Sequence, residues 1–214
     1  MISQQLKNIY FAVNRYLTLP NHYFNKIKYA VFKNDHLYLH LGSGDDYKPG
    51  MINVEGNIAQ KKDLWLDFNN GLPFKTNSVS FIFCCHTLEH FYPQQAISVI
   101  KEIHRVLKPG SIARIAVPSF DHALEIIQGI HTSKWPRNFE DGKSQAINYL
   151  FCEGQHKFAY TFEIFKRFAK EAGFKDQNIF HYSKEFGIAP KKYGKVTISE
   201  DDVPDSLVVE LTKE

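Results

Sequence analysis

The sequence predicts an α/β protein of the doubly wound class, with a mostly parallel sheet covered by helices. From residue 36 onward, short apolar runs alternate with longer segments of helical period, as expected for strands joined by helical crossovers. Turn signals separate the runs. The 214 residues, 43% of them hydrophobic and 14% aromatic, are enough to bury one large core.

Seven apolar runs are predicted as strands: His36–Leu41, Met51–Val54, Leu64–Leu66, Val79–Cys84, Ile112–Val117, Asn178–Tyr182 and Leu207–Leu211. Only residues 42–50 link the first two strands, whereas a parallel crossover normally takes about a dozen residues or more. We therefore expect a shortened first crossover that holds an abbreviated helix or a loop.

Two helices are predicted from their apolar stripes and end signals. The first begins near Pro93 and stops at Pro109-Gly110, and its stripe consists of Ala96, Val99, Ile100, Ile103, Val106 and Leu107. The second begins at Thr161 as N-cap and ends at Gly173. Residues of about 130–160 show neither the helical nor the strand period and contain Trp135-Pro136. We therefore expect a lid or insertion over a site there.

The N-terminal segment is basic and amphipathic. Residues 1–33 carry five Lys or Arg and no acid, with apolar residues at helical spacing at Ile2, Leu6, Ile9, Tyr10, Val13 and Leu17. Such a helix can lie on a membrane surface or bind a partner. The interpretation we favour is a helical cap, residues 1–35, packed against a domain that spans residues 36–214.

Composition limits the partners and the compartment. The formal net charge of +3 is too small to argue for nucleic acid. Three cysteines without metal-type spacing indicate reduced thiols and a cytoplasmic location. No apolar stretch approaches the roughly 18 residues of a membrane span, and no signal-peptide cleavage pattern is present. We expect a soluble protein without a membrane span.

A glycine turn follows the first predicted strand. Gly42 and Gly44 leave the backbone open to close approach by a ligand. A dinucleotide fingerprint would place a third glycine where Tyr47 stands, and Asp45 and Asp46 would repel a pyrophosphate. The turn thus favours a cationic or zwitterionic ligand, although a tight turn without any ligand remains an alternative.

Two carboxylates follow the second and third strands, so they should lie along the carboxyl edge of the sheet, where open parallel sheets bind ligands. Glu55 has two acceptor oxygens that suit the hydroxyls of a ribose. Asp67 can accept a hydrogen bond from an adenine amino group, and Leu66 and Phe68 would form apolar walls for the ring. Each acid alone could simply be solvated, but together with the glycines they indicate a nucleoside-bearing ligand.

A resemblance to the S-adenosylmethionine-dependent class I methyltransferases rests on the run LHLGSG…INVEGN…WLDFNNGLPFKTNSVSFIFCCHTLEHF…EIHRVLKPGSIARIAVPSF. The similar branch is found among proteins of bacterial surface-polysaccharide biosynthesis. The resemblance is strongest over residues 37–120 and continues through GQHKFAYTFEIFKRFAKEAGF to DSLVVELTK. One departure is His40, since family members often carry an acid or amide two residues before the first glycine.

The resemblance implies a Rossmann-like methyltransferase fold with a seven-stranded, mostly parallel sheet whose last strand is antiparallel, and S-adenosylmethionine as cofactor. The glycine turn would hold the methionyl end of the cofactor, Glu55 would bind its ribose and Asp67 would contact its adenine. The segment CCHTLEH would lie beside the cofactor's sulfonium. The residues expected to contact the cofactor are Leu41, Gly42, Ser43, Gly44, Glu55, Leu66, Asp67, Phe68, Cys85, His86 and Leu88.

Methyl transfer to a hydroxyl or ammonium needs a base, and histidine suits neutral pH. Of ten histidines, His86 is the first candidate and His156 the second. The resemblance suggests a small-molecule acceptor, such as a saccharide. His86, Glu89 and His90 have the spacing of metal ligands on one helix face, but no further acid accompanies them, so we assign no metal.

Two other classes of function stay open. A non-catalytic module could keep the cofactor pocket, or only the fold, while the N-terminal helix recruits a partner or a membrane. A nicotinamide-dependent oxidoreductase would share the fold class, although the acidic turn and the missing third glycine argue against it.

Overall fold

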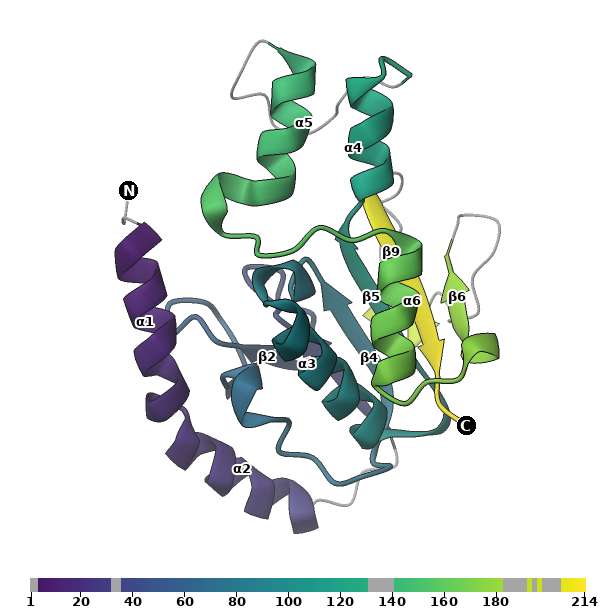
Figure 1. Cartoon of the computed structure of the whole chain (residues 1–214). Coiled ribbons are helices and arrows are strands. Elements are labelled where there is room, and N and C mark those ends of the chain that lie inside the picture. The colour runs from purple at the N-terminus through teal and green to yellow at the C-terminus, as the bar shows by residue number, and fades with distance from the viewer. Residues whose placement is uncertain (1–3, 32–35, 131–140, 183–191, 194–195, 198–204) are drawn as a thin grey trace.

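A seven-stranded sheet with the order β3-β2-β1-β4-β5-β9-β6 forms the centre of the computed structural model (Figure 1). The structure describes residues 4–31, 36–130, 141–182, 192–193, 196–197 and 205–214. The strands of this sheet are β1 Leu37–Leu41, β2 Ile52–Glu55, β3 Leu64–Trp65, β4 Val79–Cys85, β5 Leu107–Pro118, β6 Ile179–His181 and β9 Ser206–Thr212. Strands β7 (Lys192–Tyr193) and β8 (Val196–Thr197) form a separate pair.

Strands β1 to β5 pair in parallel, and β9 runs antiparallel to both of its neighbours, β5 and β6. The predicted fold class is confirmed, including the antiparallel last strand. The shortened first crossover is also confirmed, since residues 42–51, all of them described, contain turns and no helix.

One face of the sheet carries the main core. Alternate residues of each strand point to this face, as Leu37, Leu39 and Leu41 of β1 do. Helices α3 (Pro93–Val106) and α6 (Phe162–Glu171) cover it (Figure 1). Helix α3 ends at Val106, earlier than the Pro109-Gly110 signal predicts, because β5 already begins at Leu107, which pairs with Val79 of β4.

The other face of the sheet holds smaller apolar clusters and several polar side chains. His40 is 1% exposed and its Nδ1 lies 3.2 Å from Asn53 Oδ1. Burial lowers the pKa of His40 to about 4, so the ring is neutral at neutral pH. At this position, where the methyltransferases that the sequence resembles often carry an acid or amide, the chain therefore has a neutral core residue.

The N-terminal segment forms two helices, α1 (Gln4–Leu17) and α2 (Leu19–Val31), which run along one side of the molecule (Figure 1). Their polar residues face the domain, since Asn14, Thr18, His22 and Asn25 are buried. The predicted apolar stripe is largely exposed instead. Among the described residues, no helix is long and apolar enough to cross a membrane.

Helices α4 (Phe120–Ile127) and α5 (Gly142–Phe151) stand together beyond the carboxyl ends of β4 and β5 (Figure 1). They pack through Ala123, Ile126, Ala146 and Leu150, a cluster separate from the main core. The expected irregular lid thus contains a regular helix in its described part, while Trp135-Pro136 lies outside the described residues. Short 3-10 turns complete the fold: η1 Phe68–Asn70, η2 Leu88–His90, η3 Cys152–Gly154 and η4 Asp176–Asn178.

Candidate functional site

The two glycines of the turn after β1 have different surroundings. Both have positive φ, 66° at Gly42 and 50° at Gly44, which suits residues without a Cβ. A Cβ on Gly42 would collide with the Thr87 side chain, whereas one on Gly44 would meet no described atom within 4 Å. Gly42 therefore lets the loop after β4 pack closely, and Gly44 borders open space.

Glu55, at the end of β2, points into this turn. Its Oε2 accepts a hydrogen bond from the Gly44 backbone N–H at 2.8 Å, and its Oε1 accepts one from the Asn57 N–H at 2.7 Å. The hydroxyl of Ser43 is buried and has no hydrogen-bond partner in the described part of the chain. The structure thus brings together the glycine turn and the first of the two predicted carboxylates.

Asp67 lies just beyond the neighbouring strand, since the Leu66 N–H donates to the Glu55 carbonyl at 3.1 Å. Asp67 is 8% exposed, and its Oδ1 caps η1 by accepting from the backbone and side-chain N–H groups of Asn69, both at 2.8 Å. It therefore has a structural role that the strand-end pattern did not predict.

Three predicted contact residues are completely buried. Leu41, Leu66 and Leu88 are each 0% exposed as whole residues, so none of the three presents surface to a ligand in this structure. Phe68 is nearly buried and packs edge-on against Phe91, with ring centroids 6.2 Å apart.

Helix α1 reaches the same corner of the sheet. The Tyr10 hydroxyl and Asn14 Nδ2 both donate to the Gly56 carbonyl, at 2.9 and 3.0 Å. Asn14 is 1% exposed, and its Oδ1 is a buried acceptor without a hydrogen-bond partner among the residues that the structure describes. Sequence reasoning missed these residues, because no local pattern links a position in an N-terminal helix to a strand end forty residues later.

The end of β4 and the segment after it position Cys85, His86 and Glu89. His86 has a positive φ of 48°, its Nε2 lies 3.1 Å from Ser206 Oγ, and its Nδ1 lies 3.4 Å from Glu89 Oε1. Burial raises the pKa of the adjacent Cys84 thiol to about 12, so that thiol stays protonated.

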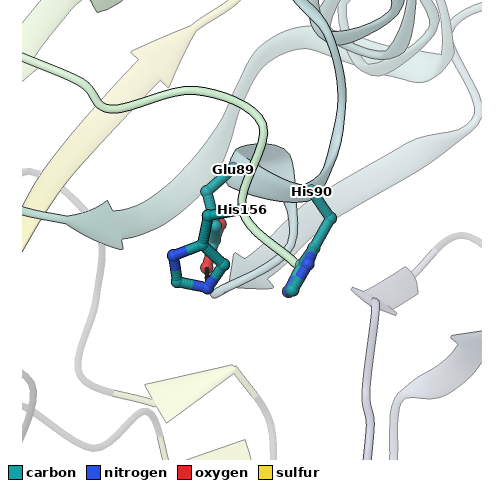
Figure 2. A group of neighbouring side chains, drawn as sticks. All are labelled: Glu89, His90 and His156. Atoms are coloured by element: carbon teal, nitrogen blue, oxygen red, sulfur yellow. Dashed lines mark ion pairs between the residues drawn. The ribbon is translucent and has the colours of Figure 1, made fainter. Parts of the chain in front are cut away.

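His156 and Glu89, distant in sequence, meet at this segment. Figure 2 shows the His156 ring beside the Glu89 carboxylate, with His90 next to them. His156 Nε2 lies 3.9 Å from Glu89 Oε1, and burial lowers the pKa of His156. Potential ligand atoms of Glu89, His90 and His156 all lie within 4.8 Å of one another. The spacing considered from sequence alone had His86 in place of His156.

Most aromatic residues near this segment serve the core. Tyr160 is 0% exposed, and Phe158 stacks on Phe168 with ring centroids 5.5 Å apart. These rings hold the segment 155–160 against the sheet rather than offering a free surface.

Residues 41–115 match the family described as a methyltransferase domain. The similarity to that family covers about a third of the chain. The match begins at the last residue of β1 and ends within β5, so it includes the glycine turn, Glu55, Asp67 and Glu89. Helices α1 and α2, the α4–α5 pair and the last strands lie outside it. Comparison with curated proteins gives no match.

Solved structures share the fold. A SAM-dependent methyltransferase from Archaeoglobus fulgidus is 15% identical with a TM-score of 0.52, over 90% of this chain and 94% of that one. A chain from a complex of the Haloferax volcanii Trm112 methyltransferase activator with a methyltransferase is 12% identical with a TM-score of 0.51, over 100% of both chains. The domain match and the fold agree with the predicted class of enzyme, an S-adenosylmethionine-dependent methyltransferase, and with the predicted cofactor.

Proposed function

We propose that this methyltransferase domain transfers a methyl group from S-adenosylmethionine to a hydroxyl of a small-molecule acceptor of the saccharide class. The observation that supports this most is the 2.8 Å hydrogen bond between the Gly44 N–H and Glu55 Oε2. It brings a backbone open to a ligand next to a carboxylate that can accept ribose hydroxyls.

The residues at this edge of the sheet suit the cofactor. In our proposal the turn from Leu41 to Gly44 holds the methionyl end, and Glu55 holds the ribose. Asp67, with Leu66 and Phe68, lies at the adenine. The residues beside the sulfonium are Cys85, His86 and Leu88. Two buried polar atoms without partners among the described residues, Ser43 Oγ and Asn14 Oδ1, support a polar ligand here, because such atoms are costly unless something bonds to them.

The chain's own contribution is positioning and proton removal. When bound, S-adenosylmethionine supplies a methyl group whose C–S electron pair stays on sulfur as the new bond to the acceptor oxygen forms. The acceptor hydroxyl must then lose its proton to a base. His86 and His156 are our candidates, since both rings lie against Glu89 and the lowered pKa of His156 keeps that ring neutral.

Partner and compartment are part of the proposal. The small net charge supports an acceptor other than nucleic acid. The absence of disulfides among the three cysteines, Cys84, Cys85 and Cys152, supports a reducing, cytoplasmic compartment.

Calorimetric titration with S-adenosylhomocysteine tests the cofactor site. We expect heat of binding with the wild type and none with Gly44→Val, because valine fills the open space beside the turn. The matched control is Gly110→Val: Gly110 also has a positive φ, and a Cβ there would meet no described atom within 4 Å, so both variants carry similar backbone strain. The proposal would be contradicted if both variants lost the same affinity for S-adenosylhomocysteine, or if the wild type gave no heat of binding.

Ligand binding and turnover together distinguish the two rival functions. A nicotinamide-dependent oxidoreductase should bind NAD and not S-adenosylhomocysteine. A non-catalytic module should bind S-adenosylhomocysteine normally, yet show no turnover with any panel of saccharide acceptors.

A further inference from the structure

The Glu89 carboxylate lacks the partners that a buried charge requires. Its side chain is 1% exposed, and neither oxygen has a hydrogen-bond partner among the described residues. The nearest ring nitrogens are His86 Nδ1 at 3.4 Å and His156 Nε2 at 3.9 Å. Buried charges in proteins are paired or coordinate metals, so this carboxylate points to a bound cation.

In both neighbouring histidines, one ring nitrogen is engaged by a backbone carbonyl. His156 Nδ1 lies 2.8 Å from the Leu150 carbonyl and His90 Nδ1 lies 3.3 Å from the Gln155 carbonyl. A carbonyl only accepts, so each Nδ1 is the donor in these contacts, and Nε2 is the ring nitrogen that faces away from them and is available to a ligand. Donation of the second ring N–H to a carbonyl is the usual arrangement of metal-binding histidines.

The backbone holds these side chains together without any metal. The N–H groups of Lys157 and Phe158 both donate to the Glu89 carbonyl, at 2.7 and 3.3 Å. The Tyr160 hydroxyl donates to the Leu88 carbonyl at 3.3 Å. Segments far apart in sequence are therefore pinned side by side, which lowers the entropic cost of assembling a three-ligand site.

We propose that Glu89, His90 and His156 bind a divalent transition-metal ion. Two imidazoles and one carboxylate suit Zn²⁺, Co²⁺, Fe²⁺ or Mn²⁺ and leave coordination positions open. Metal–ligand bonds of about 2.0–2.2 Å place adjacent ligand atoms about 3–4 Å apart. The present separations, all within 4.8 Å, need only small side-chain movements.

The site deepens the proposed function and rests on it for its role. An open position would take the acceptor hydroxyl oxygen, and the metal would lower the pKa of that hydroxyl. The proton would pass to His86, which lies beside Glu89 without belonging to the three ligands. In this arrangement His156 is a ligand and His86 the base.

Titration of chelator-treated protein with Co²⁺ tests the site by visible absorption, which does not depend on activity. We expect one equivalent to bind with d–d bands typical of low coordination number. His90→Asn and His156→Asn should each weaken binding by at least about tenfold. His36→Asn, a histidine outside the cluster, serves as the control and should bind Co²⁺ as the wild type does.

Thermal unfolding of Glu89→Gln provides a second test, whose expected result cannot be attributed to misfolding of the variant. Without metal, this variant should be at least as stable as the wild type, because a buried carboxylate without hydrogen-bond partners among the described residues is gone. Added Zn²⁺ should no longer raise its Tm. Absence of Co²⁺ bands in the wild type, or bands unchanged in all three variants, would overturn the site. Binding of S-adenosylhomocysteine, measured in parallel, reports on the proposed function separately.

A second inference comes independently from the N-terminal helices. Helix α1 exposes Leu6, Ile9, Val13 and Leu17, and helix α2 exposes Tyr23, Phe24, Ile27 and Val31. The exposed fractions reach 60% for Ile9 and 76% for Val31. Apart from the neighbours Tyr23 and Phe24, successive members within each helix are three or four positions apart, so each helix carries one apolar stripe. We call these eight residues the exposed stripe.

The charge around the exposed stripe is of one sign. Residues 4–31 contain Lys7, Arg15, Lys26 and Lys28 and no acidic residue. At about 100° per residue, Lys26 and Lys28 fall on either side of the stripe of α2, and both are exposed. An apolar face flanked by basic residues is complementary to anionic lipid headgroups above an acyl layer.

We infer that α1 and α2 bind the surface of an anionic membrane through the exposed stripe. Flotation with vesicles tests this inference. The protein should float with phosphatidylglycerol-containing vesicles and not with pure phosphatidylcholine, and less at high salt. Phe24→Ser/Ile27→Gln should abolish flotation, while Ile130→Gln, at a residue that is 61% exposed elsewhere, should not.

Two outcomes would overturn the membrane inference. One is failure of the wild type to float with anionic vesicles. The other is a dimer in light scattering that Phe24→Ser/Ile27→Gln converts to monomer, because the exposed stripe would then be an interface between two copies of the chain.

Discussion

At the scale of single residues, Glu55 connects two parts of the site. One oxygen accepts from the Gly44 N–H and the other from the Asn57 N–H, so the carboxylate is held in one orientation before any ligand arrives. A carboxylate oxygen has two lone pairs, which leaves each oxygen able to accept one further hydrogen bond. Preorganisation of this kind lowers the entropic cost of binding.

Glu55→Gln should weaken S-adenosylhomocysteine binding by roughly tenfold or more, because one oxygen becomes an NH₂ donor that faces a backbone N–H or a ligand hydroxyl. Isothermal titration measures the loss. Glu163→Gln, at an exposed acid on α6, should leave the affinity unchanged. An unaltered affinity in Glu55→Gln would contradict the role assigned to this residue.

At the scale of elements, a buried ion pair joins β5 to β9. Arg114 and Glu210 are paired in the antiparallel register, are 4% and 0% exposed, and lie 2.5 Å apart from Nη2 to Oε1. The guanidinium also lies 4.4 Å above the Tyr182 ring. The pair fixes the register of the last strand on the more polar face of the sheet.

Arg114→Met should lower the free energy of unfolding by about 3–5 kcal/mol, since it leaves Glu210 charged and buried without this cation. The double variant Arg114→Met/Glu210→Met should recover most of that loss, because two apolar residues replace the pair. Urea denaturation gives both values. If the double variant were less stable than Arg114→Met, the unpaired charge would not be the cause.

At the scale of the whole molecule, burial keeps several histidines neutral. Desolvation is the largest cause of the lowered pKa at His22, His40 and His104. The unfolded chain therefore binds protons at a higher pH than the folded protein does. The free energy of unfolding must then fall as the pH falls from the ordinary histidine pKa toward the lowered values of the folded protein.

His40 should contribute most clearly, because its pKa moves from 6.5 to about 4 in the folded protein. The free energy of unfolding should drop by about 3 kcal/mol from this residue between pH 6.5 and pH 4. His40→Gln, which keeps an amide beside Asn53, should flatten the pH dependence in denaturation curves measured from pH 7 to pH 4. An unchanged slope would show that other groups control it.

Local patterns predicted the parts of the structure that depend on near neighbours in sequence. The stripe of α3 and the alternation of Leu37, Leu39 and Leu41 follow from side-chain periodicity. The loop in the first crossover follows from its length. The helix α5 escaped prediction because its apolar residues, such as Ala146 and Leu150, pack on α4 rather than on the main core.

The sequence by itself determined the class of sheet, the open glycine turn and the order of the acids along its edge, because each depends on residues within one strand and the turn that follows. Only the tertiary structure decided that Glu89 meets His156, that Asn14 lies at the end of β2, and that the apolar side of α1 and α2 faces outward. Those contacts join segments tens of residues apart, and local spacing carries no information about which segments come together when the chain folds.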